Sequence, residues 1–131
     1  MVGMAPNRDP WSERKVLVVD DDEVFHEILE LALENTGQII SALDGDEIVE
    51  KAKSLRPDFI IMDLQMSAVH GFEAIQLLKA DPVTQNIPVI VVSAYVREED
   101  RKHAFESGAD AFIPKPLLLP SLREELRKIL G

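Results

Sequence analysis

The sequence feature that most constrains the fold is an uninterrupted apolar run, Phe59–Met62, which stands between Pro57-Asp58 and the acid Asp63. A continuous apolar run of this length is typical of a strand that is buried on both faces, as in a parallel sheet. The strand must end where a carboxylate appears, because burying an unpaired charge is costly. Asp63 is therefore predicted at the carboxyl end of a central strand, the edge at which open α/β sheets bind ligands. The alternative is that Asp63 only caps the following turn.

Strand-like and helix-like segments alternate strictly along the chain. The other predicted strands are Val16–Val19, Gln38–Ala42, Pro88–Val92 and Ala111–Ile113, and the predicted helices cover about 23–34, 46–54, 72–80, 98–107 and 120–130. Five such units predict an α/β fold, in which a parallel sheet has helices on both faces and right-handed crossovers. For a single domain this indicates a doubly wound five-stranded sheet of order 2-1-3-4-5 with five helices, in three α/β/α layers.

The apolar stripes of the helices indicate which side chains form the core. The expected core positions are Ile48, Val49 and Ala52, then Ile75 and Leu78 with help from Leu77, then Leu122, Leu126, Ile129 and Leu130. Helix 98–107 offers little besides Ala104 and Phe105. A helix with so few apolar contacts is a natural candidate for movement.

Length and composition limit the classes of function. At 131 residues we expect one domain over 15–131, preceded by a flexible leader over 1–14 that has no periodicity. The net charge of −10 argues against direct binding to nucleic acid or to a membrane surface. The absence of cysteine, of a signal peptide and of a membrane-length apolar run fits a cytoplasmic protein. The sequence ends just after the last predicted helix, so we expect no effector segment within it.

Polar residues follow four of the five predicted strands. Asp20 and Asp21 follow the first strand, and the later ones are followed by Asp63, Ser93 and Lys115. Because the carboxyl ends of parallel strands share one edge, we expect these side chains to converge there. Crowded carboxylates repel one another, and a divalent cation and an ammonium relieve that repulsion. Oxygen ligands without sulfur favour Mg²⁺, so the set predicts a phosphoryl-transfer site with Asp63 as the nucleophile.

These residues resemble the receiver domain of two-component response regulators, which has a flavodoxin-like fold. The matching pieces are Val18-Val19-Asp20-Asp21, Ile61-Met62-Asp63-Leu64-Gln65-Met66, Val92-Ser93-Ala94 and Lys115-Pro116. The resemblance implies that Asp63 accepts a phosphoryl group from a histidine kinase or a histidine phosphotransfer domain. It also implies that Asp21, Asp63 and the backbone carbonyl of Gln65 bind Mg²⁺ directly, and that Asp20 acts on the ion directly or through a water. Ser93 and Lys115 would bind the phosphoryl oxygens.

The resemblance further implies a conformational switch. Ser93 would move toward the phosphoryl group, and Phe112 would match the family's switch aromatic and rotate inward. The readout would be the face formed by helix 98–107, strand 111–113 and helix 120–130, which is also a candidate surface for a homodimer. Gln65, Ala94 and Tyr95 would flank the pocket. The chain departs from the common family pattern at Ser67 and His70, outside the proposed chemistry.

Two other functions compete with a phosphoacceptor switch. A Mg²⁺-dependent phosphohydrolase would use Asp63 as a turnover nucleophile, but no second acid stands two residues after Asp63 to act as general acid. A degenerate receiver would act only as an interaction module, which the intact set of acids, serine and lysine disfavours. The preferred interpretation is a signalling switch that is not a turnover enzyme.

Overall fold

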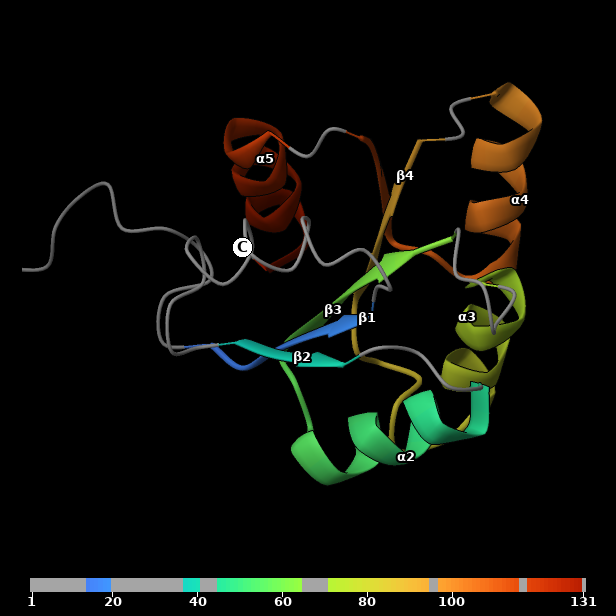
Figure 1. Ribbon diagram of the computed structural model, residues 1–131, viewed down its shortest axis with the longest axis vertical. Coiled ribbons are helices and arrows are strands. Elements are labelled where there is room, and N and C mark those ends of the chain that lie inside the picture. Colours follow the sequence, from blue (N-terminus) through green and yellow to red (C-terminus); the bar gives the residue numbers. More distant parts are fainter. Residues whose placement is uncertain are drawn as a thin grey trace, which may run out of the picture.

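The computed structural model of the protein describes residues 14–19, 37–40, 45–64, 71–94, 97–115 and 118–130. In these ranges five parallel strands form one sheet, in the order β2-β1-β3-β4-β5. The strands are β1 (Val16–Val19), β2 (Gly37–Ile40), β3 (Phe59–Asp63), β4 (Val89–Ser93) and β5 (Ala111–Pro114). Strand β3, which ends at Asp63, therefore lies in the middle of the sheet (Figure 1).

Helices cover both faces of the sheet. Helices α2 (Gly45–Leu55), α3 (Gly71–Ala80) and α4 (Glu98–Ser107) lie on one face, and α5 (Leu119–Leu130) lies on the other (Figure 1). This arrangement confirms the predicted parallel α/β fold. The helix predicted over 23–34 and residues 1–13 of the predicted leader lie outside the described residues. Within the described ranges, no helix combines the length and the apolar character that a membrane crossing requires.

In the part of the chain that the structure describes, the core consists of two apolar clusters, one on each face of the sheet. Along β1, Leu17 and Val19 pack into the cluster with α2, α3 and α4, whereas Val16 and Val18 pack into the cluster with α5. All four side chains are fully buried. Alternate residues of a strand project to opposite faces, so a strand covered on both sides needs apolar residues at every position. This burial explains the continuous apolar runs in the sequence.

Most of the predicted helical core positions whose burial the structure describes are buried or partly buried, but two are exposed. Leu77 is 36% exposed and Phe105 is 41% exposed, so the prediction that they pack in the core is wrong. On α3 the buried stripe runs through Ile75 and Leu78, and Leu77 lies one residue, about 100°, away from Leu78. Phe105 is displaced in the same way from Ala104, which with Ser107 forms the buried side of α4.

Two acids at the amino-terminal edge of the sheet bind backbone amides. The Lys15 amide donates to Asp58 Oδ2 at 2.8 Å, which joins the starts of β1 and β3. The Val89 amide donates to Asp110 Oδ2 at 2.8 Å, and Lys79 Nζ donates to the same oxygen at 2.9 Å. Hydrogen bonds to charged groups are among the stronger ones in proteins, so these contacts help to set where the strands begin.

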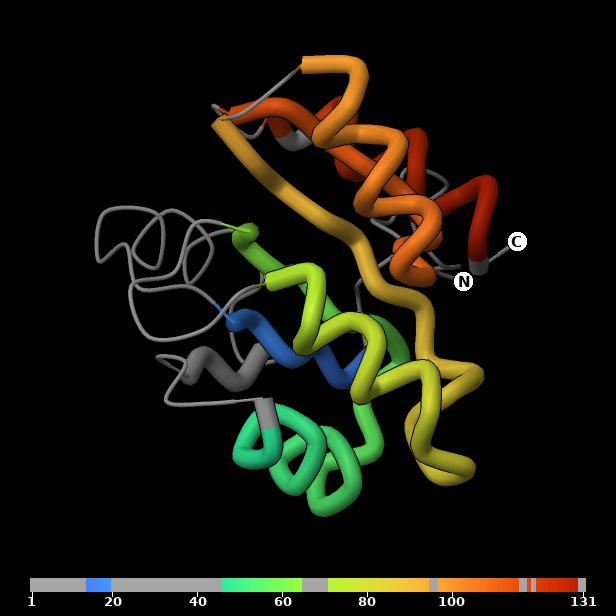
Figure 2. Tube along the Cα trace, turned by 90° about the vertical axis from the view of Figure 1, so that its right-hand side faces the viewer, coloured from blue at the N-terminus to red at the C-terminus, as the bar shows by residue number. Residues whose placement is uncertain are grey.

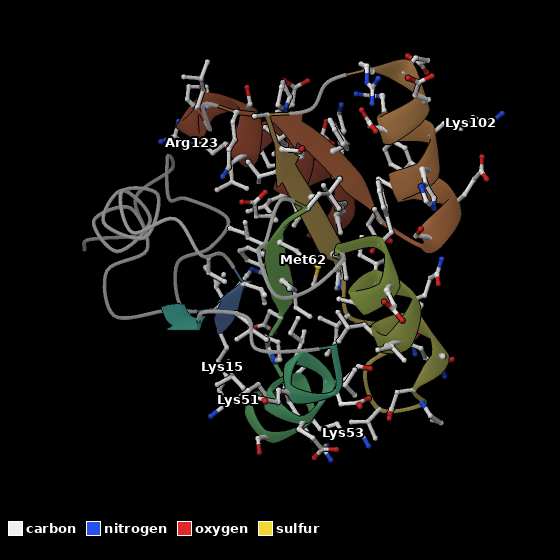
Figure 3. All side chains as sticks on the ribbon, turned by 45° about the vertical axis from the view of Figure 1, so that its right-hand side comes forward. Lys15, Lys51, Lys53, Met62, Lys102 and Arg123 are labelled. Carbon is white, nitrogen blue, oxygen red and sulfur yellow. The ribbon has the colours of Figure 1, made fainter. Side chains whose placement is uncertain are left out.

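A surface ion pair joins α2 to the end of α3. Lys53 Nζ lies 2.9 Å from Asp81 Oδ2, and Lys53 is labelled in Figure 3. Hydrogen bonding between them raises the pKa of Lys53 and lowers the pKa of Asp81 below its ordinary value of 3.8. Because the folded-state pKa of Asp81 is the lower one, its stabilising contribution is present above pH 3.8 and is lost as the pH falls through the folded value. Both side chains are partly exposed to solvent, which keeps this contribution small.

Candidate functional site

Three neighbouring strands deliver polar side chains to the carboxyl edge of the sheet. Asp63 is the last residue of β3, directly after Met62, which Figure 3 labels near the centre of the sheet. Ser93 is the last residue of β4, and Lys115 directly follows β5. Asp63 and Ser93 are 3% and 0% exposed. The fold thus brings three of the predicted site residues to one edge, and two of them are buried polar groups.

The central contact of the site is an ion pair between β3 and the end of β5. Lys115 Nζ donates to Asp63 Oδ2 at 3.0 Å, and the two side chains are 17% and 4% exposed. The residues are 52 positions apart in the chain. A buried carboxylate requires a partner of opposite charge, and the ammonium supplies it. The pair places the carboxylate next to a cation, the arrangement that a nucleophile for phosphoryl transfer needs.

The backbone holds Lys115 in place beside Ser93. The Lys115 amide donates to the Ser93 carbonyl oxygen at 2.8 Å, one step beyond the register pair of Ser93 and Pro114. Residue Ala94, which follows Ser93, is exposed at the surface. A shift of the β4 end would therefore act directly on the residue that carries the ammonium.

Four of the predicted site residues lie outside the described residues, namely Asp20, Asp21, Gln65 and Tyr95. Asp20 follows Val19 in the chain, and Val19 pairs in register with Met62, the residue before Asp63. Among the described residues, no group of three or more His, Cys, Asp or Glu side chains could hold a metal ion. Asp63 is the one predicted metal ligand in that part of the chain, and its carboxylate oxygens are the hard donors that Mg²⁺ prefers. The described donor therefore fits the predicted metal.

Phe112, the predicted switch aromatic, is 6% exposed and belongs to the cluster beneath α3 and α4. Its ring is therefore already buried in this structure, whereas the predicted inward rotation would start from an exposed ring. It lies three residues before Lys115 and pairs in register with Val91. This position connects the core beneath α4 to the residue that binds Asp63.

Gly71, the first residue of α3, is a residue of the site that the sequence analysis did not single out. A β-carbon at this position would lie 2.8 Å from the Leu64 Cα atom and 3.3 Å from the Asp63 carbonyl oxygen. The start of α3 therefore packs directly against the backbone that follows the phosphoacceptor candidate. A glycine before an apolar helix was a weak signal of this contact, because the packing depends on residues that the fold brings together.

We expect Gly71→Ala to destabilise the fold by about 1–3 kcal/mol, the usual cost of forcing an extra carbon into a packed site. The added carbon must push Leu64 away, which also displaces the end of β3. Urea unfolding followed by circular dichroism measures the loss. A Gly71→Ala protein as stable as the wild type would contradict the close approach.

A family sequence model and the similar known proteins point to the same family. The sequence model of the response regulator receiver domain family matches residues 16–127. The polar-differentiation response regulator DivK of Brucella anthropi is 33% identical over 119 residues, which cover 90% of this chain and 97% of that protein. DivK of Brucella ovis is 32% identical over the same shares.

Solved structures show the same fold. A putative response regulator from Chloroflexus aurantiacus matches with a TM-score of 0.78 at 26% identity, over 89% of this chain and 97% of that one. The receiver domain of the sensor histidine kinase PA1611 from Pseudomonas aeruginosa, which has a magnesium ion coordinated in its active site cleft, matches with a TM-score of 0.77. That match is 24% identical and covers 90% of this chain and 98% of the other, so it supports the fold alone.

Proposed function

Because the chain belongs to the response regulator receiver domain family, we propose that it is a phosphoacceptor switch that takes a phosphoryl group on Asp63. Receiver domains are signalling modules of two-component systems, in which histidine kinases and phosphotransfer proteins are the partners. The donor here is therefore a histidine kinase or a histidine phosphotransfer domain. The observation that carries the proposal is the 3.0 Å contact between Lys115 Nζ and the buried Asp63 carboxylate.

In the proposed transfer, a carboxylate oxygen of Asp63 bonds to phosphorus while the bond from phosphorus to the donor's imidazole nitrogen breaks. The electron pair of the broken bond stays on that nitrogen, which takes a proton from solvent. The Lys115 ammonium and the Ser93 hydroxyl then hold the phosphoryl oxygens by charge-assisted hydrogen bonds. The ion pair that holds Asp63 in the free protein supports this role, because Lys115 already lies within hydrogen-bond distance of the reacting group.

The metal ligands in this proposal are Asp20, Asp21, Asp63 and the backbone carbonyl of Gln65. Mg²⁺ bound there would neutralise part of the charge on the transferring phosphoryl group. Asp63 is the described member of this set, and its burial at the carboxyl edge of β3 supports the assignment. Gln65, Ala94 and Tyr95 would flank the entrance through which the donor reaches Asp63.

Phosphorylation would add about −1.5 to −2 charges and three acceptor oxygens. In the proposed switch Ser93 moves toward these oxygens, and Phe112 keeps the buried position that it has in this structure. Phosphorylation then stabilises one arrangement of α4, β5 and α5, which would form the output face and the surface of any homodimer.

We assign this activity to residues 15–131, with residues 1–14 as a leader. We also propose that the protein acts in the cytoplasm without contacting nucleic acid or membrane directly.

Incubation of the protein with acetyl phosphate and Mg²⁺, followed by intact mass measurement and peptide mapping, tests the proposal. We expect one phosphoryl adduct on the peptide that contains Asp63, and we expect EDTA to prevent it. Release of phosphate over many turnovers would support a phosphohydrolase instead. A protein that forms no adduct and releases no phosphate would be a degenerate receiver, and the proposed function would be wrong.

A further inference from the structure

Helix α4 is held to the rest of the domain by few buried side chains. Of its ten residues, only Ala104 and Ser107 are buried. It lies alongside α3 (Figure 2), and the rings of Phe72 and His103 stack between the two helices with centroids 3.9 Å apart. Contacts made by exposed and partly buried side chains therefore help to position α4.

Arg101 joins α4 to a buried aromatic ring of the sheet. Its guanidinium carbon lies 5.5 Å from the centroid of the Phe105 ring and 5.8 Å from the centroid of the Phe112 ring. Both distances are within the range of attractive cation–π contacts. Phe105 is 41% exposed on α4 itself, whereas Phe112 belongs to β5 and is 6% exposed. The exposed arginine thus links the surface of α4 to a buried ring of the sheet.

That ring is connected to Asp63 by contacts within the described residues. Phe112 pairs with Val91 across β5 and β4, so its side chain projects to the same face of the sheet as Val91 and, two residues further on, Ser93. Three residues after Phe112, Lys115 donates its amide to the Ser93 carbonyl and its ammonium to Asp63. Displacement of the Phe112 ring would therefore displace Ser93 and Lys115, the two residues that are proposed to bind the phosphoryl oxygens.

We propose that Arg101 is a positioning residue, whose guanidinium holds the Phe112 ring in its buried place and thereby couples α4 to the readiness of Asp63 to accept a phosphoryl group. This inference rests on the proposed phosphoacceptor function. Coupling between the equilibria of two sites is reciprocal, so we expect phosphorylation of Asp63 to strengthen the attachment of α4. A partner that draws Arg101 away from the rings will in turn lower the competence of Asp63.

The test compares Arg101→Met with Lys102→Met. Methionine keeps most of the length of each side chain and removes one positive charge from α4 in both proteins. Lys102 is exposed and extends away from the helix into solvent (Figure 3), so it is the matched control. We expect Arg101→Met to slow phosphorylation by acetyl phosphate and Mg²⁺ by roughly two- to fivefold, the factor that an exposed cation–π contact supplies. Lys102→Met should react at the wild-type rate.

A second measurement does not depend on phosphorylation. In two-dimensional NMR spectra of the unphosphorylated proteins, the amide signals of Phe112 and Lys115 should shift in Arg101→Met and stay in place in Lys102→Met. If the wild type accepts no phosphoryl group, the proposed function fails, and this measurement still decides whether Arg101 positions Phe112.

A double substitution tests whether the effect runs through the ring. In a Phe112→Leu background, which keeps an apolar side chain but has no aromatic face, Arg101→Met should cause no further slowing. Two results would overturn the inference: equal rates and equal spectra for the Arg101 and Lys102 variants, or a slowing by Arg101→Met that persists in full without the aromatic ring.

Discussion

The Asp63→Asn protein will take up no phosphoryl group from acetyl phosphate, while the wild type becomes singly phosphorylated. The amide lacks the negative oxygen that attacks phosphorus, and it is a poorer ligand for a divalent cation. The fold should survive, because the amide oxygen can still accept the hydrogen bond from Lys115 Nζ that Asp63 Oδ2 accepts at 3.0 Å. Intact mass measurement detects the adduct, and thermal unfolding checks the fold.

Asp46→Asn is the matched control for this substitution. Asp46 lies on the exposed surface of α2 and loses the same charge on substitution, so its phosphorylation should equal that of the wild type. A phosphoryl adduct that persists in Asp63→Asn would place the phosphoacceptor at another residue and would contradict the proposed mechanism.

The second large effect is expected from Lys115→Met, which should impair both chemistry and stability. Loss of a positive donor aimed at a transferring group typically slows the reaction by about a hundred- to a thousandfold. The same change leaves the Asp63 carboxylate, 4% exposed, without its ammonium partner. Removing one member of a buried ion pair is strongly destabilising, and we expect a loss of about 2–4 kcal/mol in the free energy of unfolding. Acetyl phosphate kinetics and urea unfolding measure the two effects.

The two substitutions together separate charge from packing. In the Asp63→Asn background the side chain at position 63 carries no charge, so Lys115→Met should cost much less stability than it does in the wild type. Lys51→Met, on the exposed surface of α2, controls for loss of a lysine and should change neither quantity. Equal destabilisation by Lys115→Met in both backgrounds would show that the ion pair contributes little and that the lysine stem acts by packing.

Much of the fold follows from local sequence pattern. The apolar runs of β1, β3 and β4 stand where the sequence predicts them, because a strand covered on both faces favours apolar side chains up to the edge of the sheet. Helix α4 begins at Glu98 and ends at Ser107 as predicted, with Gly108 in the left-handed conformation at its end. The errors at Leu77 and Phe105 arose because a thin or broad apolar stripe leaves the rotation of a helix about its axis undetermined until its neighbours are known.

The sequence by itself determined which residues end the central strands, and therefore that Asp63, Ser93 and Lys115 reach one edge of the sheet. Parallel strands place their carboxyl ends together whatever the packing details are. Only the tertiary structure decided the contacts that act on this set: Lys115 on the Asp63 carboxylate, Gly71 against Leu64, and Arg101 over the Phe112 ring. The physical reason is that such contacts depend on the rotation and height of whole helices, which the summed packing of the two core clusters fixes and no local pattern encodes.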